Sequence, residues 1–257
     1  MEPARRLRHR IENNQLTLGM LISFHLSMEL IEIAIKTGLD YVIVDSEHLD
    51  HGQAAMADAC SMGRVADFAV LVRPAATDFD TVHQIMDLGP AGLLLPMVET
   101  AEQLDSVRDG IYMPPRGKRR PGGPGNRWLE DRFNYADFKA VVEDHLIIVP
   151  QIESPLGLEQ ADAIAAHPIT TALGIGPYDL SARLGVCWEP DHPKNVAALE
   201  RIRQAATAAG KPNWVIGDGR QRIEQGFHFL CIAEPSMMLQ TALTQLVVDL
   251  RGPGKCA

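Results

Sequence analysis

Residues 41–48 read YVIVDSEH, an apolar run that ends at once in acidic and polar side chains. An unbroken apolar run is typical of a parallel strand covered on both faces, because a strand with one exposed face shows alternation instead. The segment therefore predicts a buried strand over 41–45. That strand would deliver polar side chains at its carboxyl end.

Seven more runs of this kind recur along the chain, and helical patterns separate them. The expected strands are 17–22, 41–45, 69–73, 92–96, 146–152, 171–176, 214–217 and 229–233. The expected helices are 28–37, 53–65, 78–87, 101–109, 135–144, 157–166, 195–209 and 236–250. Eight strand–helix units in about 250 residues match the size of a (β/α)8 TIM barrel, which is an α/β fold.

A doubly wound parallel sheet is the main alternative fold, and it normally carries a glycine-rich phosphate turn after its first strand. Here that turn reads SFHLS, residues 23–27, and contains no glycine. We therefore expect a single barrel domain over 1–257, with 1–16 as an N-terminal helix or arm and 236–257 as a C-terminal helix and tail. The proline- and glycine-rich stretch 114–125 is interpreted as a long loop and not as a linker.

The composition excludes several classes of protein. The chain has 257 residues, 46% of them hydrophobic and 22% charged, so it is not a disordered polypeptide. The net charge of −9 argues against non-specific nucleic-acid binding, which needs a basic surface. No apolar run approaches the roughly 20 residues of a membrane helix. The four cysteines form no CxxC pair, and we expect a reduced, cytoplasmic protein.

Functional side chains of a TIM barrel come from the carboxyl ends of its strands. The fifth strand is followed by Gln151-Ile152-Glu153, and strand alternation places Gln151 and Glu153 on one side. Asp179 follows the sixth strand through a Gly-Pro turn. Two carboxylates on neighbouring strands predict an open Mg²⁺ or Mn²⁺ site. Taken singly, Glu153 could instead serve a helix N-cap and Asp179 a helix start.

A second polar group follows the second strand. Asp45 and His48 fit a carboxylate that orients an imidazole for general-base work, although a surface-loop histidine is the alternative for His48. A zinc site of Glu47, His48 and His51 is disfavoured, because it lacks a distant third ligand and the helical HExxH spacing.

Arg73 ends the third strand, where a guanidinium can form a salt bridge or stabilise an enolate or aldol oxygen. A Schiff-base mechanism needs a lysine at such a position. The six lysines of the chain all lie in expected helices, loops or the tail. The sequence therefore favours chemistry that uses a metal and an arginine.

Six segments carry a family resemblance: GLDYVIVDSEH (38–48), VRP (72–74), LGPAGLLLPMVET (88–100), YMPPRG (112–117), QIES (151–154) and GIGPYDLSARLG (174–185). Together they resemble the HpcH/HpaI aldolases, metal-dependent class II pyruvate aldolases on a (β/α)8 barrel. The resemblance runs from about residue 17 to about residue 240 in family order. The combination is specific, whereas any one segment alone would be weak.

The resemblance implies a carbon–carbon lyase. The reaction would be reversible retro-aldol cleavage of a 4-hydroxy-2-oxo acid into pyruvate and an aldehyde, through a metal-stabilised pyruvate enolate. Glu153 and Asp179 would hold the divalent metal, Mg²⁺ or Mn²⁺, with Co²⁺ as a further candidate. Family members are usually oligomers, often hexamers, so we expect a homo-oligomer in which the last helix is exchanged between subunits.

The same resemblance assigns roles around the metal. His48, oriented by Asp45, would serve the proton transfers, and Arg73 would stabilise the enolate and alkoxide oxygens. Gln151 would hydrogen-bond near the same oxygens. Backbone amides around Gly176, Pro177 and Tyr178 would bind the pyruvate carboxylate.

This chain also departs from the family pattern. Met20 or Leu21 stands where the family usually has a tryptophan, and Tyr178 replaces a small residue, so that its ring would narrow the pocket or supply a hydroxyl. The loop that contains Arg116, Lys118, Arg119 and Arg120 is interpreted as a solvated basic loop. Attraction of an anionic aldehyde is its alternative role.

Three other functions stay open on these residues. An oxaloacetate-type decarboxylase would share every core residue. A citrate-lyase-like enzyme acting on a thioester is disfavoured by the short chain. A non-catalytic metabolite-binding barrel is disfavoured because Asp45, His48 and Arg73 together exceed what binding requires.

Overall fold

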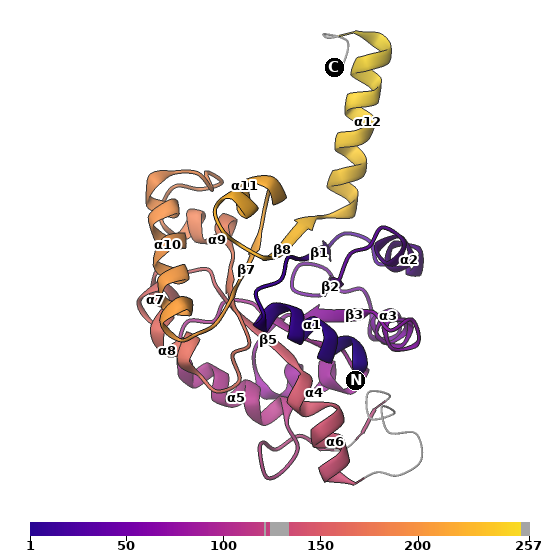
Figure 1. Ribbon diagram of the computed structural model, residues 1–257, viewed down its shortest axis with the longest axis vertical. Coiled ribbons are helices and arrows are strands. Elements are labelled where there is room, and N and C mark those ends of the chain that lie inside the picture. The colour runs from indigo at the N-terminus through magenta and orange to yellow at the C-terminus, as the bar shows by residue number, and fades with distance from the viewer. Residues whose placement is uncertain (121, 124–133, 253–257) are drawn as a thin grey trace.

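The computed structural model describes residues 1–120, 122–123 and 134–252, and at its centre is a closed barrel of eight parallel strands in the order β1 to β8 (Figure 1). The strands are β1 (Thr17–Ile22), β2 (Tyr41–Asp45), β3 (Ala69–Arg73), β4 (Gly92–Leu95), β5 (Ile147–Ile152), β6 (Leu173–Ile175), β7 (Asn213–Ile216) and β8 (Phe229–Ala233). Strand β8 pairs with β1 and closes the barrel. The predicted TIM barrel is confirmed.

Helices cover the outside of the barrel. They are α1 (Glu2–Glu12), α2 (Met28–Lys36), α3 (Gln53–Val65), α4 (Phe79–Leu88), α5 (Ala101–Ile111), α6 (Tyr135–Val141), the 3-10 turn η2 (Glu143–His145), α7 (Pro155–Glu159), α8 (Ala161–Ala166), α9 (Pro177–Arg183), α10 (Pro193–Ala208), α11 (Gly219–Glu224) and α12 (Pro235–Arg251). The expected helix 157–166 is thus divided into α7 and α8, and the short helices α9 and α11 were not predicted. Among the described helices, none has the length and apolar character needed to cross a bilayer.

Side-chain caps fix where the helices begin after the strands. Ser27, Asp78, Ser154 and Asp218 each accept a hydrogen bond from a backbone N–H in the first turn of α2, α4, α7 and α11. Such caps satisfy donors that a helix start leaves unpaired. The loops at the carboxyl ends of the strands are therefore held in defined positions.

Large side chains fill the barrel interior. The Tyr41 hydroxyl donates to the Leu230 carbonyl at 2.8 Å and accepts from Nε1 of Trp214 at 2.9 Å. The Tyr41 ring contacts Phe229 edge-on, with centroids 5.1 Å apart. Gly19 lies opposite Tyr41 in the β1–β2 register, and a Cβ there would collide with the tyrosine ring. Glycine at position 19 thus makes room for the ring.

The loop after α5 differs from the expectation of a solvated basic loop. Arg119 is only 2% exposed and its Nη2 lies 2.8 Å from Oδ1 of Asp87. Arg116 pairs with Asp144 at 2.8 Å, and Lys118 pairs with Asp109. Burial of Arg119 corrects the prediction for this residue, because its charge stabilises the packing of the loop, whereas Lys118 and Arg120 are exposed as predicted. The loop leaves α5 on the side of the barrel opposite the strands' carboxyl ends. Residues 121, 124 and 125 of the predicted loop lie outside the described part of the chain.

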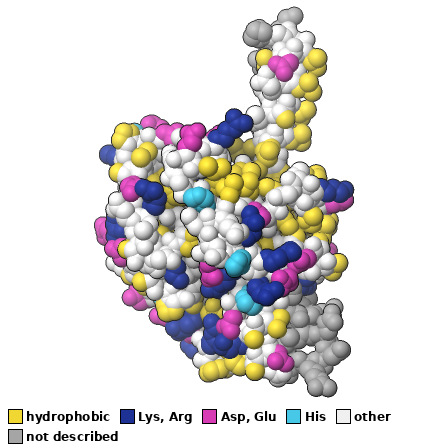
Figure 2. All heavy atoms as spheres, in the orientation of Figure 1, with side chains coloured by type: hydrophobic (Ala, Val, Ile, Leu, Met, Phe, Trp, Pro, Cys, Tyr) yellow, Lys and Arg dark blue, Asp and Glu magenta, His cyan; other side chains and the backbone are white. Residues whose placement is uncertain are grey.

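Helix α12 projects away from the barrel (Figure 1) and none of its residues is buried. Its large exposed apolar side chains are Met237, Met238, Leu239, Leu243, Leu246 and Leu250. Figure 2 shows apolar side chains along the length of this helix. A surface of this kind on a single helix is typical of a protein–protein contact.

Candidate active site

Two buried polar side chains stand at the end of β5. Gln151 and Glu153 are each 2% exposed. Oε2 of Glu153 accepts a hydrogen bond from the backbone N–H of Met97 at 3.0 Å. Within the described chain, Oε1 of Glu153 and Oε1 of Gln151 are buried without a hydrogen-bond partner. Buried oxygens without partners are costly, so this pair indicates a place where a cation or a ligand belongs.

Gly176, at the end of β6, brings the neighbouring strand against this pair. A Cβ at position 176 would collide with Oε1 of Glu153 and lie 2.8 Å from Nε2 of Gln151. The absence of a side chain lets the start of α9 approach the two buried groups. The structure therefore brings together the predicted residues Gln151, Glu153 and Gly176.

Negative charges converge on Glu153. The pKa of Glu153 is raised to about 8, mainly by burial and also by the carboxylates of Glu47 and Asp179, against the lowering effects of the Met97 N–H and of Arg73. Burial likewise raises the pKa of Glu47, with contributions from Asp45 and Asp179, although Arg73 and His48 act in the opposite direction. Carboxylates that raise one another's pKa are stabilised by a cation.

The donor set fits a hard divalent cation. Magnesium and manganese bind a few carboxylates and keep open positions for water and substrate. Glu153 supplies a buried oxygen without a partner, and Asp179 lies exposed in the first turn of α9. In the described part of the chain, no three His, Cys, Asp or Glu side chains converge as a closed ligand set. The alternative zinc site of Glu47, His48 and His51 therefore gains no support.

A buried ion pair joins the ends of β2 and β3. Asp45 is fully buried, and it lies opposite Arg73 in the parallel register. Nε of Arg73 donates to Oδ1 of Asp45 at 2.8 Å, and Nη2 donates to Oδ2 at 2.6 Å. The Ser23 hydroxyl also donates to Oδ2, at 2.8 Å. Such a bidentate contact fixes the plane of the guanidinium.

The electrostatics of this pair favour both charged forms. Burial by itself raises the pKa of Asp45, but the hydrogen bonds and charge of Arg73 and the Ser23 hydroxyl hold that pKa below its ordinary value. Burial lowers the pKa of Arg73, while Asp45, Glu47 and Glu153 raise it above its ordinary value. Nη1 of Arg73 lies 3.1 Å from Oε2 of Glu47. The guanidinium thus reaches from Asp45 toward the acidic group around Glu153.

His48 lies farther out than expected. Its side chain is 56% exposed, and its Nε2 lies 3.9 Å from Oε2 of Glu47. Both oxygens of Asp45 are engaged by Arg73 and Ser23, so the expectation that Asp45 orients His48 is wrong for this structure. The carboxylate nearest to His48 is that of Glu47.

The start of α9 carries the remaining predicted residues. The Gly176 N–H is used by the Ile152 carbonyl at 3.3 Å, and Pro177 has no N–H. Among the described residues, the N–H groups of Tyr178 and Asp179 are the donors left over at this helix start. The Tyr178 side chain is exposed and its ring lies against that of Trp188, with centroids 6.4 Å apart.

Three residues near the site were not predicted as members of the metal and substrate site: Glu47, Ser23 and Trp188. Glu47 had a signal in the sequence, because alternation places it on the same side as Asp45. Ser23 follows β1 directly, which is the position from which a barrel strand reaches the site. Trp188 had no such signal, since its contact with Tyr178 depends on the path of the loop after α9.

The comparisons with known proteins find relatives that are named aldolases. The family model described as HpcH/HpaI aldolase/citrate lyase matches residues 20–227. The hydroxypyruvate/pyruvate aldolase of Chromohalobacter salexigens is 31% identical over 86% of this chain and 88% of its own length. The 2-keto-3-deoxy-L-rhamnonate aldolase of Shigella boydii is 29% identical over 93% of this chain and 90% of its own length.

A solved structure of a family member has the same fold. The crystal structure of an HpcH/HpaI aldolase from Desulfitobacterium hafniense superposes with a TM-score of 0.89 at 26% identity, covering 97% of this chain and 98% of the other. The family match spans most of the barrel, including every strand from β2 to β7. The chain therefore belongs to the HpcH/HpaI aldolase/citrate lyase family.

Proposed function

We propose that the protein is a divalent-metal-dependent aldolase that reversibly cleaves a 4-hydroxy-2-oxo acid into pyruvate and an aldehyde. The observation that carries this proposal is the buried Oε1 of Glu153, which has no partner among the described residues and lies in a group of carboxylates beside the anchored Arg73. The names of the aldolase relatives support the same reaction class.

Glu153 and Asp179 would hold the divalent ion, with Mg²⁺ or Mn²⁺ as the expected metals and Co²⁺ as a further candidate. The bound ion would polarise the 2-oxo group of the substrate and offset developing negative charge. Glu47 adds a third negative charge, which favours a cation further. Gly176 keeps the space next to the Glu153 carboxylate open.

Arg73 would stabilise the oxygen that becomes negative when the carbon–carbon bond breaks. Arg73 is 5% exposed and its guanidinium is held by Asp45, so it needs no reorganisation during the reaction. We propose Asp45 as the positioning residue for Arg73. Gln151 would donate a hydrogen bond from its amide to the same group of substrate oxygens.

His48 would carry protons between the substrate and solvent. Its exposure and its contact with Glu47 suit a group that exchanges protons with water. The pyruvate carboxylate would bind at the start of α9, beside Gly176 and Pro177. There the N–H groups of Tyr178 and Asp179 are the available donors.

Tyr178 and Trp188 would contact the aldehyde portion of the substrate. Trp188 is 77% exposed and has a φ of 63°, a left-handed conformation that is uncommon for a bulky residue. The backbone N–H of Trp188 donates to Oγ of Ser181, which itself donates to the Tyr178 carbonyl at 2.6 Å. This connection holds an aromatic pair next to Asp179 and favours aldehydes with an apolar substituent.

Helix α12 would pack on the barrel of a second copy of this chain, giving a homo-oligomer that we expect to be a hexamer. Leu239 and Leu243 line a groove on the helix together with Val247. Light scattering on the purified protein should give a multiple of the chain mass. The variant L239D/L243D should be smaller in solution, and an unchanged mass for this variant would exclude α12 from the interface.

The test of the reaction is a substrate panel. Purified protein with Mg²⁺ or Mn²⁺ should release pyruvate from 4-hydroxy-2-oxo acids, and EDTA should stop the release. The panel includes oxaloacetate, so that a decarboxylase would be recognised by carbon dioxide release without aldehyde. Activity that persists in EDTA would refute the metal-dependent mechanism.

A further inference from the structure

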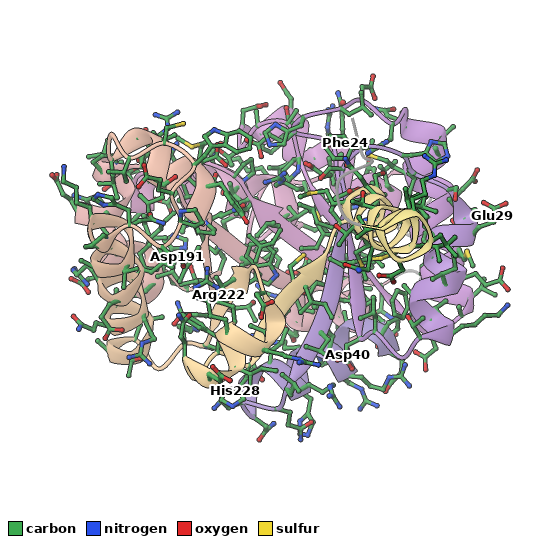
Figure 3. All side chains as sticks on the ribbon, turned by 90° about the horizontal axis from the view of Figure 1, so that it is seen from above. Phe24, Glu29, Asp40, Asp191, Arg222 and His228 are labelled. Carbon is green, nitrogen blue, oxygen red and sulfur yellow. The ribbon has the colours of Figure 1, made fainter. Side chains whose placement is uncertain are left out.

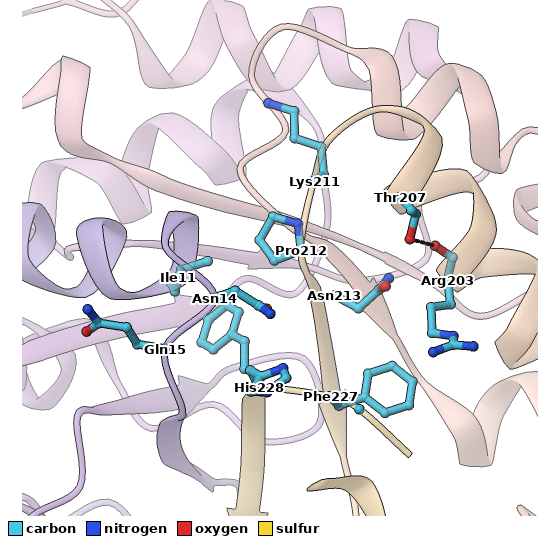
Figure 4. A pocket seen from close by; sticks show the side chains of 12 residues that line it. Ile11, Asn14, Gln15, Arg203, Thr207, Lys211, Pro212, Asn213, Phe227 and His228 are labelled. Carbon is cyan, nitrogen blue, oxygen red and sulfur yellow. Dashed lines mark hydrogen bonds between the residues drawn. The ribbon is translucent and has the colours of Figure 1, made fainter. Parts of the chain in front are cut away.

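A cavity lies at the other end of the barrel from the candidate active site. It has a volume of about 190 Å³ and is bordered by the ends of α1 and α10 and the starts of β7 and β8 (Figure 4). Figure 3 shows His228, which precedes β8, and Phe24, which follows β1, at opposite ends of the barrel. This end of a TIM barrel usually serves stability, so a polar cavity here calls for an explanation.

The charge of the cavity wall is positive. Of its twelve lining residues, Arg203 and Lys211 are cationic and none is acidic. Nε of Arg203 donates to Oε2 of Glu200 at 2.8 Å. Nη1 of Arg203 lies near Gly226, another lining residue, at 3.9 Å from where a Cβ would stand. Lys211 has no carboxylate within ion-pair distance in the described part of the chain. A carboxylate entering the cavity would therefore meet cations that face no acid inside it.

Polar groups of the wall also lack partners. Nδ1 of His228 is buried and has no hydrogen-bond partner among the described residues. The backbone of this histidine is fixed, because its carbonyl accepts from the Thr17 N–H at 2.7 Å. Asn14, also in the wall, has a left-handed φ of 52°. Because His228 lines the cavity, a ligand oxygen that reached this nitrogen would pair it and lower the cost of its burial.

The remaining wall is apolar and limits the ligand. Phe227 and Phe229 line the cavity with Ile11 and Pro212. The volume corresponds to about six waters at ~30 Å³ each. An inorganic oxyanion would leave the aromatic part of the wall without contact. A carboxylate with a short carbon chain matches both the cationic and the apolar parts.

We propose that this cavity is a binding site for small monocarboxylates of about six non-hydrogen atoms, with Arg203, Lys211 and His228 as the groups that recognise the carboxylate. The site is independent of the proposed aldolase reaction. These three residues come from α10, the segment before β7 and the segment before β8, none of which supplies a residue to the candidate active site.

The test is a titration of the full-length protein with butanoate in EDTA, followed by calorimetry and by saturation-transfer NMR. Wild type should bind butanoate saturably, and 1-butanol, its neutral analogue, should not bind. The variant R203M/K211M should bind at least about tenfold more weakly, because each charged hydrogen bond contributes about that factor. H228F should also weaken binding.

The matched control is K194M/R201M, which also removes one lysine and one arginine charge, but outside the cavity. Lys194 is exposed, and Arg201 pairs with Asp162. This control variant should bind butanoate like wild type. Equal affinity for R203M/K211M and wild type, or no saturable binding at all, would overturn the proposal. Phosphate that binds more tightly than butanoate with the same variant dependence would overturn the carboxylate assignment. Aldolase activity of R203M/K211M should be unchanged, so the two proposals fail separately.

Discussion

Replacing Asp45 with asparagine removes the charge that holds Arg73 while keeping the shape of the side chain. The Asp45 carboxylate is fully buried and accepts two hydrogen bonds from Arg73, at 2.8 and 2.6 Å. Removing one partner of a buried pair costs about 3–5 kcal/mol. Glu47 still lies 3.1 Å from Nη1 of Arg73 in the variant's starting geometry, so we expect the lower end of this range. A loss of about 3 kcal/mol corresponds to a fall in Tm of about 6–12 °C for a chain of this size.

The matched control is Asp162→Asn, which makes the same change at an exposed pair. Arg201 contacts both oxygens of Asp162, at 3.1 and 2.5 Å, but the two side chains are 36% and 68% exposed. Exposed pairs contribute about 0–1 kcal/mol. Urea unfolding at a single protein concentration should therefore separate the variants by about 2 kcal/mol or more. Equal losses in the two variants would refute the argument from burial.

The pH dependence gives a second check on the same variant. The pKa of Asp45 lies below its ordinary value of 3.8, so its contribution to stability is complete above pH 3.8 and is lost as the pH falls through the folded-state pKa. Asparagine does not titrate. The difference in free energy of unfolding between wild type and D45N should therefore narrow in acid. A difference that stays constant down to the pH of acid unfolding would contradict a lowered pKa of Asp45 in the folded state. Turnover of D45N should fall by about 10²-fold, as for loss of a preorganised donor, with metal affinity retained.

Three further variants test other residues of the account. Glu153→Ala should abolish binding of Mg²⁺ or Mn²⁺ in calorimetry, because it removes the buried oxygen without a partner; unchanged affinity would exclude Glu153 as a ligand. His48→Ala should slow turnover by about 10²–10⁴-fold, the usual contribution of general acid–base catalysis, and should leave metal affinity intact; normal turnover would remove its role. Burial raises the pKa of Glu143 above its ordinary value of 4.5, so wild-type stability falls as the pH rises through the window between the two values. Glu143→Gln should abolish that fall, so that the free energy of unfolding of the variant rises relative to that of wild type as the pH is raised above 4.5. Urea unfolding at a series of pH values measures this, and parallel curves for the two proteins would contradict it.

Hydrophobic pattern was sufficient to predict the barrel. Buried parallel strands are short and apolar, so β1, β2, β3 and β8 were predicted with the bounds that the structure has. The short helices α9 and α11 have too few residues to show a helical period, and they were missed. Helices α7 and α8 are separate because the chain turns at Gln160, where no proline or glycine marks the break.

The residues of the candidate site were predicted from the sequence, but not all of the contacts between them. Alternation along one strand placed Gln151 and Glu153 together, and the structure agrees. The partner of Asp45 could not be predicted in this way, because the β2–β3 register, which sets Asp45 opposite Arg73, is a property of two strands. The burial of Arg119 could not be predicted for the same reason, since its partner Asp87 lies on another element, α4, which comes before β4 and α5. Sequence pattern gives the face of each element, and packing decides which faces meet.

The most direct test of the central claim is exchange of the pyruvate methyl protons with solvent. This exchange needs the metal, Arg73 and a proton carrier but no aldehyde, so it isolates the proposed site from substrate preference. In D₂O, proton NMR should show the pyruvate methyl signal decaying with wild type and Mg²⁺ or Mn²⁺. The decay should stop in EDTA and in the Glu153→Ala variant. Exchange at the wild-type rate under either condition would contradict a metal site at Glu153 as the origin of the chemistry.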